Sequence, residues 1–174
     1  FLQDSAFIFK TNNVYLVNSD GPDNFGQGSQ WPPPRQLSVG GTPFRNSAVS
    51  TPEGVMFVSN AGAKLINYAG GMSPIGDADP ELFKGKIVAA VNFASKDQVR
   101  WYKSNGDAVV FDYREGRFST WTGLECRAAF VANERAYLVR LGGYLWREAY
   151  GTEEVWQDDT TPIEMVIRTA WNQM

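Results

Sequence analysis

The stretch Gln98–Gly123, QVRWYKSNGDAVVFDYREGRFSTWTG, holds three runs of aromatic and β-branched residues separated by two turns. It predicts strands over 99–103, 108–113 and 118–122, with turns at 104–107 and 114–117. Asn105-Gly106, in the first turn, supplies the positive φ angles of a tight hairpin and is a strong short-range signal for one. Three consecutive antiparallel strands are therefore expected here.

Three other segments repeat this order of strand, turn and strand. The predicted strand pairs are Ala6–Lys10 with Val14–Val17, Val55–Val58 with Lys64–Tyr68, and Ala136–Arg140 with Tyr144–Trp146. The turns between them are expected at Thr11–Asn13, Asn60–Ala63 and Leu141–Gly143. The hairpins start roughly 50, 44 and 37 residues apart, close to the period of about 40–50 residues that propeller blades show.

A mostly small or apolar segment precedes each of the last three hairpins, at Asn46–Thr51, Ile87–Phe93 and Arg127–Val131. Such a segment suits a strand that is buried on both faces, as the innermost strand of a propeller blade is. The expected fold class is all-β, with a β-propeller-like repeat of four-stranded antiparallel blades. About four blade equivalents are visible, the first without an inner strand, so the propeller is incomplete.

Helical periodicity is weak throughout. One helix-like start stands at Asp79-Pro80, an N-cap followed by proline, and Gly85 limits it to about one turn. The segment Asp20–Gly41 predicts a long loop with a polyproline-like piece at Trp31–Pro34. We expect this loop to contact a partner.

The end of the chain differs from the repeat. An acidic segment, Glu153–Asp159, surrounds Val155 and Trp156 and is expected to be a second contact surface. Beyond Pro162, an alternating strand is predicted over Ile163–Thr169. We divide the chain into a propeller portion, 1–160, and the start of a following module or closing strand, 161–174. Because the chain opens at Phe1 and not at Met, a portion of a longer polypeptide is expected.

Composition excludes several classes of site. The chain has 174 residues, is 43% hydrophobic and carries a net charge of −3, with no block of Lys and Arg to grip duplex DNA. With Cys126 the single cysteine and no histidine, an internal disulfide, a Cys/His zinc site and a histidine-activated nucleophile are all excluded. No apolar run is long enough to span a bilayer, and no membrane partner is expected.

Two motifs suggest ligand sites but fail on spacing. Asp77, Asp79 and Glu81 resemble the start of a calcium loop, yet Leu82 and Val88 stand where an EF-hand needs glycine and a carboxylate. The turns Ser19–Gly21 and Ser104–Asp107 resemble the Asp-box of sialidase-type propellers without its spacing. Turn chemistry explains all three segments.

Acidic and aromatic residues leave a glycan-related function open. A glycosidase needs two carboxylates, and candidates are Asp112, Glu115, Glu125, Glu134 and Glu148. Aromatic side chains could form a carbohydrate platform. Alternation along strands favours packing between sheets instead, for Phe7, Phe9, Phe57, Trp101, Phe111 and Trp121. No residue is assigned a catalytic, cofactor or metal role.

The order of the pieces resembles a known family. Phe44–Gly62, then Asp107–Tyr113 closing on Phe118–Trp121, and finally Trp156–Asp159 leading to Pro162–Thr169, are similar to the tail hub or nozzle proteins of short-tailed bacteriophages, also called DNA-stabilization proteins. The resemblance covers about Ala6–Thr169 and rests on pattern, not on an invariant motif.

This resemblance implies a β-propeller in a homo-oligomeric ring that surrounds the DNA exit channel below the portal of the virion. Partners would be further copies, portal or adaptor proteins, tail fibres or a needle, and DNA passing without sequence-specific contact. The family supplies no catalytic residue or cofactor, so a non-enzymatic structural role is expected. Two alternatives remain: a carbohydrate-binding or glycan-cleaving propeller, and a propeller scaffold of a cellular complex.

Overall fold

The structure is a computed structural model that describes residues 5–18, 27, 32–75, 80–140, 142–148, 157–158 and 161–162. The described part is all-β, with four antiparallel sheets and one short strand pair. Two short 3-10 helices, η1 (Pro80–Phe83) and η2 (Ala94–Lys96), interrupt the strands. No helix in these ranges has the length and apolar character needed to cross a membrane.

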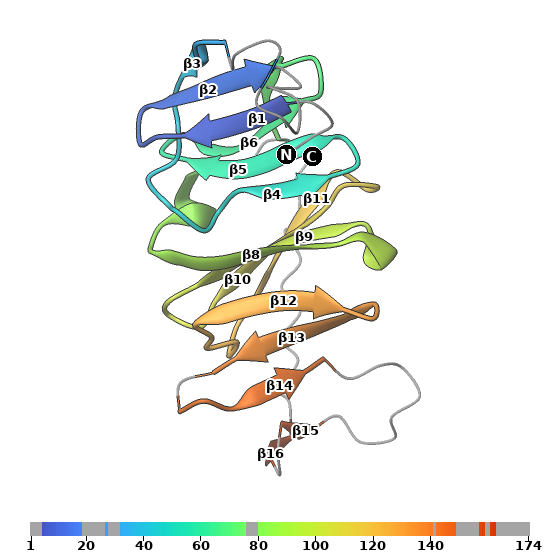
Figure 1. The fold of residues 1–174 in the computed structure, drawn as a ribbon. Helices are drawn as coiled ribbons and strands as arrows, with labels where there is room; N and C mark the ends of the chain where they lie inside the picture. Colours follow the sequence, from blue (N-terminus) through green and yellow to red (C-terminus); the bar gives the residue numbers. More distant parts are fainter. Residues whose placement is uncertain are drawn as a thin grey trace, which may run out of the picture.

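The sheets follow one another along the chain (Figure 1). The first contains β1 (Ser5–Phe9), β2 (Asn13–Asn18) and β3 (Arg35–Val39). The second contains β4 (Val49–Thr51), β5 (Gly54–Ser59), β6 (Gly62–Asn67) and β7 (Met72–Pro74). The third contains β8 (Ile87–Phe93), β9 (Gln98–Lys103), β10 (Ala108–Asp112) and β11 (Arg117–Trp121). The fourth contains β12 (Ala128–Ala132), β13 (Arg135–Val139) and β14 (Leu145–Arg147), and a separate pair contains β15 (Gln157–Asp158) and β16 (Thr161–Pro162).

All four predicted hairpins are confirmed, with ends that differ by one or two residues. In the third sheet, Val109 pairs with Trp101 on one side and with Thr120 on the other, so the three expected strands form a continuous ladder. The predicted inner strand Ile87–Phe93 has the expected bounds. The predicted helix-like turn is η1, a single 3-10 turn that begins at Pro80.

The turn chemistry differs in detail from the expectation. In the loop between β9 and β10, Gly106 has a positive φ of +87°, whereas Asn105 does not. The Lys103 N–H donates to the Asp107 carbonyl at 2.8 Å, which closes a four-residue loop that needs one positive φ. Two successive positive φ angles occur instead at Asn133 (49°) and Glu134 (58°), in the two-residue turn between β12 and β13.

Two strands lie where the sequence analysis expected none. Arg35–Val39, inside the predicted loop Asp20–Gly41, pairs with β2 as β3, and Met72–Pro74 pairs with β6 as β7. Both carry polar or proline residues, which weaken the apolar signal of an edge strand. The predicted strand Asn46–Thr51 is too long, since β4 covers its last three residues. The predicted turn Asn60–Ala63 is too long as well, because β6 begins at Gly62.

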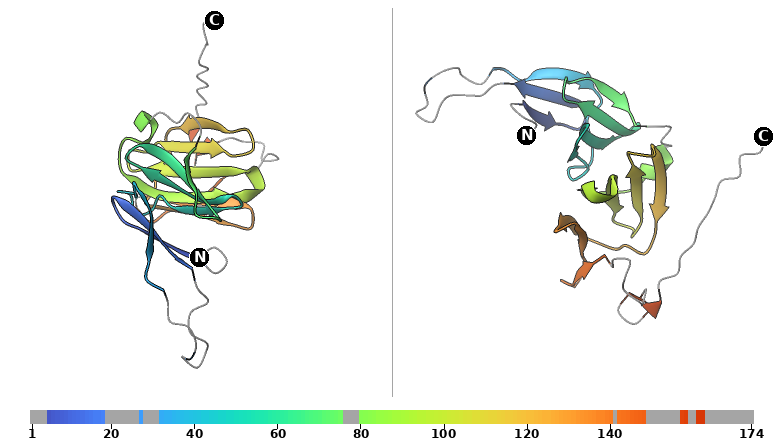
Figure 2. Two further views of the ribbon diagram at one scale, coloured as in Figure 1. Left: turned by 90° about the horizontal axis from the view of Figure 1, so that it is seen from above. Right: turned by 90° about the vertical axis from the view of Figure 1, so that its right-hand side faces the viewer.

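The four sheets pack face to face in chain order (Figures 1 and 2). We call the face that packs on the next sheet the forward face and the opposite one the rear face. Phe7 and Phe9 of the first sheet pack on Phe57 and Ile66 of the second, with ring centroids of Phe9 and Phe57 5.0 Å apart. The same alternation of faces repeats in the later sheets.

The second and third sheets enclose the largest core. Met56 and Val58 on the forward face of the second sheet meet Val99 and Trp101 on the rear face of the third. Phe83, from η1, closes this core with its ring edge-on to Trp101, at a centroid distance of 5.6 Å. The third and fourth sheets meet through two sets of residues: Ala89, Val91, Tyr102, Ala108 and Cys126 from the third sheet and the turn after it, and Ala129, Val131 and Leu138 from the fourth.

Strand β8, the first strand of the third sheet, contacts both β4 and β12, the first strands of the neighbouring sheets. Two asparagine side chains bridge β8 and the segment around β4: Asn46 Nδ2 donates to the Val88 carbonyl at 2.8 Å, and Asn92 Nδ2 to the Ser50 carbonyl at 3.0 Å. The second and third sheets have the predicted four strands each. The first and fourth have three, within the part of the chain that is described.

Candidate functional site

Two ion pairs that share Glu148 lie between the third and fourth sheets. Arg100 faces forward from the middle of β9, and its side chain is 1% exposed. Its Nη1 donates to Glu148 Oε2 at 2.7 Å, and Lys96 Nζ, from η2, lies 3.0 Å from Glu148 Oε1. Arg100 also donates to Gln98 Oε1 through Nε and Nη2, at 3.2 and 2.9 Å. We call Lys96, Gln98, Arg100 and Glu148 the inter-sheet clamp.

Aromatic rings hold the guanidinium of the inter-sheet clamp on two sides. The Arg100 Cζ atom lies 4.6 Å from the ring centroid of Phe93 and 4.6 Å from that of Trp121. Because a guanidinium is weakly hydrated and planar, it can be buried against rings while its edge forms an ion pair. Glu148 follows β14 directly, and its N–H donates to the Ala136 carbonyl at 2.9 Å, which fixes the carboxylate beside Arg100.

The electrostatics of the inter-sheet clamp favour the ionised form of the Glu148 carboxyl group. Burial alone would raise the pKa of Glu148, but the hydrogen bonds and charges of Arg100 and Lys96 outweigh it and hold that pKa below its ordinary value. A carboxyl group that is ionised at neutral pH cannot serve as a general acid. Glu148 is therefore suited to holding two sheets together.

Cys126 and Tyr102, which lie at the same interface, are not activated as nucleophiles either. Burial raises the pKa of the Cys126 thiol to about 11, so the sulfur is protonated at neutral pH and is a weak nucleophile. Burial likewise raises the pKa of Tyr102, although the Arg100 charge opposes that shift. Neither side chain has the lowered pKa that an activated nucleophile requires.

A network of buried polar groups joins the second and third sheets. Trp101 Nε1 donates to the Ser47 carbonyl at 2.8 Å, and the hydroxyls of Ser47 and Thr42 are 2.8 Å apart. The Ser47 hydroxyl also accepts the Val58 N–H at 3.3 Å. Since these partners satisfy one another inside the core, the network fixes the position of β9 against β4.

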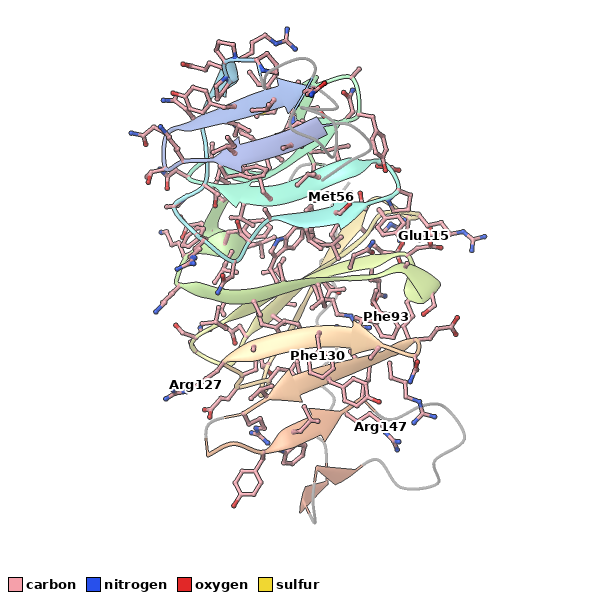
Figure 3. The ribbon with its side chains drawn as sticks, viewed as in Figure 1. Met56, Phe93, Glu115, Arg127, Phe130 and Arg147 are labelled. Carbon is pink, nitrogen blue, oxygen red and sulfur yellow. The ribbon has the colours of Figure 1, made fainter. Side chains whose placement is uncertain are left out.

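The five carboxylates considered for glycoside hydrolysis lie in different surroundings. Asp112 accepts the N–H groups of Arg114 and Glu115 and so shapes the β10–β11 turn, at the tip of which Glu115 is exposed (Figure 3). Glu134 stands in the β12–β13 turn, and Glu125 lies beside Gly106. Glu148 is the one of the five that belongs to the inter-sheet clamp. Within the described residues, no group of three or more His, Cys, Asp or Glu side chains could hold a metal ion.

The six aromatic residues expected between sheets are found there. Phe57, Trp101 and Phe111 are buried, and Phe7, Phe9 and Trp121 are partly buried against the inter-sheet cores. The inter-sheet clamp was not predicted from the sequence. An arginine in the middle of the most apolar strand, Val99-Arg100-Trp101, was the signal that a buried partner was needed, but nothing in the sequence pointed to Glu148.

Other sequence hypotheses lie largely outside the described residues. These are the turn Ser19–Gly21, the calcium-like Asp77 and Asp79, most of the acidic segment Glu153–Asp159, and the strand Ile163–Thr169. Of the calcium-like group, Glu81 is described, and it forms an ion pair with Lys84.

The forward face of the fourth sheet carries partly exposed apolar side chains. Phe130 is 42% exposed and Leu145 is 58% exposed. The rings of Phe130 and Tyr137 stack with centroids 5.1 Å apart and planes 8° apart. Strand register places Arg147 opposite Tyr137, so it borders the same face, where Figure 3 labels it together with Phe130. Arg135 borders this face from the start of β13.

The chain matches no protein-family model, and no curated protein matches it either.

Proposed function

We propose that the protein is a structural interaction protein of a bacteriophage tail, a subunit of the hub or nozzle ring below the portal. In this role it forms part of the wall of the DNA exit channel and a surface to which tail fibres or a needle attach. The assembly role rests on one observation: the buried Arg100 and the partly exposed Lys96 both form ion pairs with Glu148 across the boundary of two sheets. The tail assignment rests on the resemblance of residues 44–62, 107–121 and 156–169 to that family.

In the proposed architecture the four sheets are consecutive blades of a β-propeller. The inner strands β4, β8 and β12 line its axis, and the contacts of β8 with both β4 and β12 support this arrangement. Each pair of neighbouring sheets buries aromatic and aliphatic side chains between forward and rear faces, as blades do. A propeller built in this way is stiff, because side-chain packing and the inter-sheet clamp hold its sheets together.

Charge supports passage of DNA without tight binding. The chain has 16 basic and 19 acidic residues, for a net charge of −3. The affinity of proteins for DNA comes largely from Lys and Arg contacts with phosphates. Arg100 and Lys96 form ion pairs with Glu148. Lys103 contacts Asp107 and a backbone carbonyl oxygen. Fewer cations are therefore left for phosphate contacts.

The test is the mass of the full-length protein in solution and in purified tail complexes, measured by light scattering and native mass spectrometry. A ring gives a defined multiple of the subunit mass and copurifies with portal or adaptor proteins. A stable monomer that joins neither portal nor ring would reject the proposal. Binding on a glycan array, with a monomeric mass, would favour the carbohydrate-binding alternative.

A further inference from the structure

Strands β4 and β8 run in the same direction. The Asn46 side chain donates to the Val88 carbonyl at 2.8 Å. The Asn92 side chain donates to the Ser50 carbonyl at 3.0 Å. In both bonds the partners are 42 positions apart, which indicates parallel strands. Figure 1 shows that β4, β8 and β12 all begin on the left of the view, so the residues that precede them lie at one end of the sheet stack.

A basic residue stands before each of the three strands. These residues are Arg45, Lys86 and Arg127, which follow one another at intervals of 41 positions. Since β4 and β8 are offset by about the same interval and β8 also contacts β12, the three cations form a row across the second, third and fourth sheets. All three side chains are exposed. Figure 3 labels Arg127 at this end and the acidic Glu115 at the opposite end. We call Arg45, Lys86 and Arg127 the basic row.

The charges of the basic row are available to a ligand. Within the part of the chain that the structure describes, its three side chains form no ion pair and no hydrogen bond. Two carboxylates at the same end, Glu81 and Asp107, form ion pairs with Lys84 and Lys103. The exposed Glu125 lies near the row as well, but it balances only one of the three cations. This end therefore attracts anions.

The side chains around the basic row are polar donors. Ser104 and Asn105 are exposed in the β9–β10 loop, where the Ser104 N–H donates to the Lys86 carbonyl at 2.9 Å. Tyr144, in the loop between β13 and β14 at the same end, is 69% exposed. Hydroxyl and amide side chains of this kind act together with Lys and Arg in contacts with DNA phosphates. The composition of this end therefore matches a phosphate backbone.

We infer that the basic row is the surface on which duplex DNA contacts this protein, through phosphates and without readout of bases. Packed sheets lie about 10 Å apart, so the row extends over about 20 Å. A duplex carries one negative charge for about every 1.7 Å of its axis, and one that lies across the three sheets presents phosphates to all three cations. Three contacts give weak, salt-sensitive binding, which allows DNA to slide. The inference rests on the proposed function, in which DNA passes the protein, and identifies the surface that meets it.

Fluorescence anisotropy of a short labelled DNA duplex of random sequence, titrated with the complete chain, tests the inference. With three phosphate contacts, the logarithm of the association constant should fall against the logarithm of salt concentration with a slope of about −2.7. Arg45→Gln, Lys86→Gln and Arg127→Gln, combined in one chain, should reduce the affinity at about 50 mM salt at least tenfold and bring the slope close to zero.

The matched control removes three exposed arginines away from the basic row. Arg35→Gln, Arg114→Gln and Arg117→Gln change the net charge equally, and they replace residues at the start of β3, in the β10–β11 turn and at the start of β11. This variant should bind the duplex within about twofold of the wild type. An equal loss in both variants would show that net charge alone attracts DNA and would overturn the inference.

Two further results would also overturn it. One is the absence of binding by the wild type at about 50 mM salt. The other is displacement of the duplex by polyglutamate as efficiently as by unlabelled DNA of the same charge concentration, which would identify an acidic protein segment as the partner. The failure of the proposed ring is detected separately, by the mass measurement. A monomer that binds DNA through the basic row would reject the ring alone, and a ring whose subunits do not bind DNA would reject this inference alone.

Discussion

Arg100 and Glu148 stand 48 positions apart in the chain, yet Arg100 Nη1 and Glu148 Oε2 are 2.7 Å apart across the boundary of two sheets. The guanidinium is almost completely buried and lies between the rings of Phe93 and Trp121. The pair is a short charged contact that joins the third and fourth sheets.

Replacing Glu148 by Ala should destabilise the protein by about 2–4 kcal/mol, because it leaves a buried guanidinium without a carboxylate. The value lies toward the low end for buried pairs, since the Glu148 side chain is 25% exposed. Urea unfolding followed by tryptophan fluorescence measures the change. The matched control, Glu115→Ala in an exposed turn, should change stability by no more than about 0.5 kcal/mol. Equal losses in both variants would contradict the role of the ion pair.

Stability should fall in acid, in part through Glu148. The folded protein holds the pKa of this carboxyl below its ordinary value, so the unfolded chain binds its proton first as pH decreases. The stabilisation is present above about pH 4.3, the ordinary glutamate value, and is lost as pH falls through the lower folded pKa. Unfolding free energies measured between pH 7 and pH 3 should show a shallower acid slope for Glu148→Gln than for the wild type. Parallel curves would be the contrary result.

Trp101→Phe keeps an aromatic ring in the core but removes the Nε1 donor to the Ser47 carbonyl. A buried acceptor without its partner should cost about 1–3 kcal/mol. Thermal unfolding of this variant is compared with that of Trp121→Phe, which replaces a partly buried ring that stacks on Arg100. The Trp101 variant should be the less stable of the two, and the reverse order would show that the Ser47 contact contributes little.

Gly54 lies where β5 comes very close to β6. Its φ is +145°, and an added Cβ would stand 2.0 Å from the Ile66 carbonyl oxygen, a backbone atom that cannot move aside alone. Gly54→Ala is therefore expected to cost at least about 3 kcal/mol. Gly116→Ala is the control, because its φ is +66° and nothing lies within 4 Å of the added carbon. Its cost should be only about 1–2 kcal/mol, as left-handed backbone requires. Chemical denaturation of both variants gives the comparison.

The parts of this fold that could be predicted from the sequence are those determined by residues close together in the chain. The hairpins around Asn12, Gly106 and Gly142 were predicted, because turn residues and flanking apolar runs are adjacent in the chain. Strand β3 was missed because it follows three prolines and begins with the exposed Arg35 and Gln36 before the partly buried Leu37, which leaves no apolar run to detect. An edge strand depends on its neighbour for hydrogen bonds more than on its own side chains.

The candidate site was less predictable for a different reason. Alternation placed Trp101 and Phe111 between sheets correctly, since it depends only on the position of a residue in its strand. The partner of Arg100 depends on how two sheets meet, and Glu148 was one of five carboxylates with no local feature to distinguish it. Long-range ion pairs of this kind become visible only when the order and register of the sheets are known.

Imaging of purified phage tails that contain the full-length protein tests the central claim most directly. The account predicts several copies of this fold in a ring below the portal, with the inner strands of their sheet stacks arranged as propeller blades. Density that places the chain outside any ring, or purified tails that lack it altogether, would contradict the account.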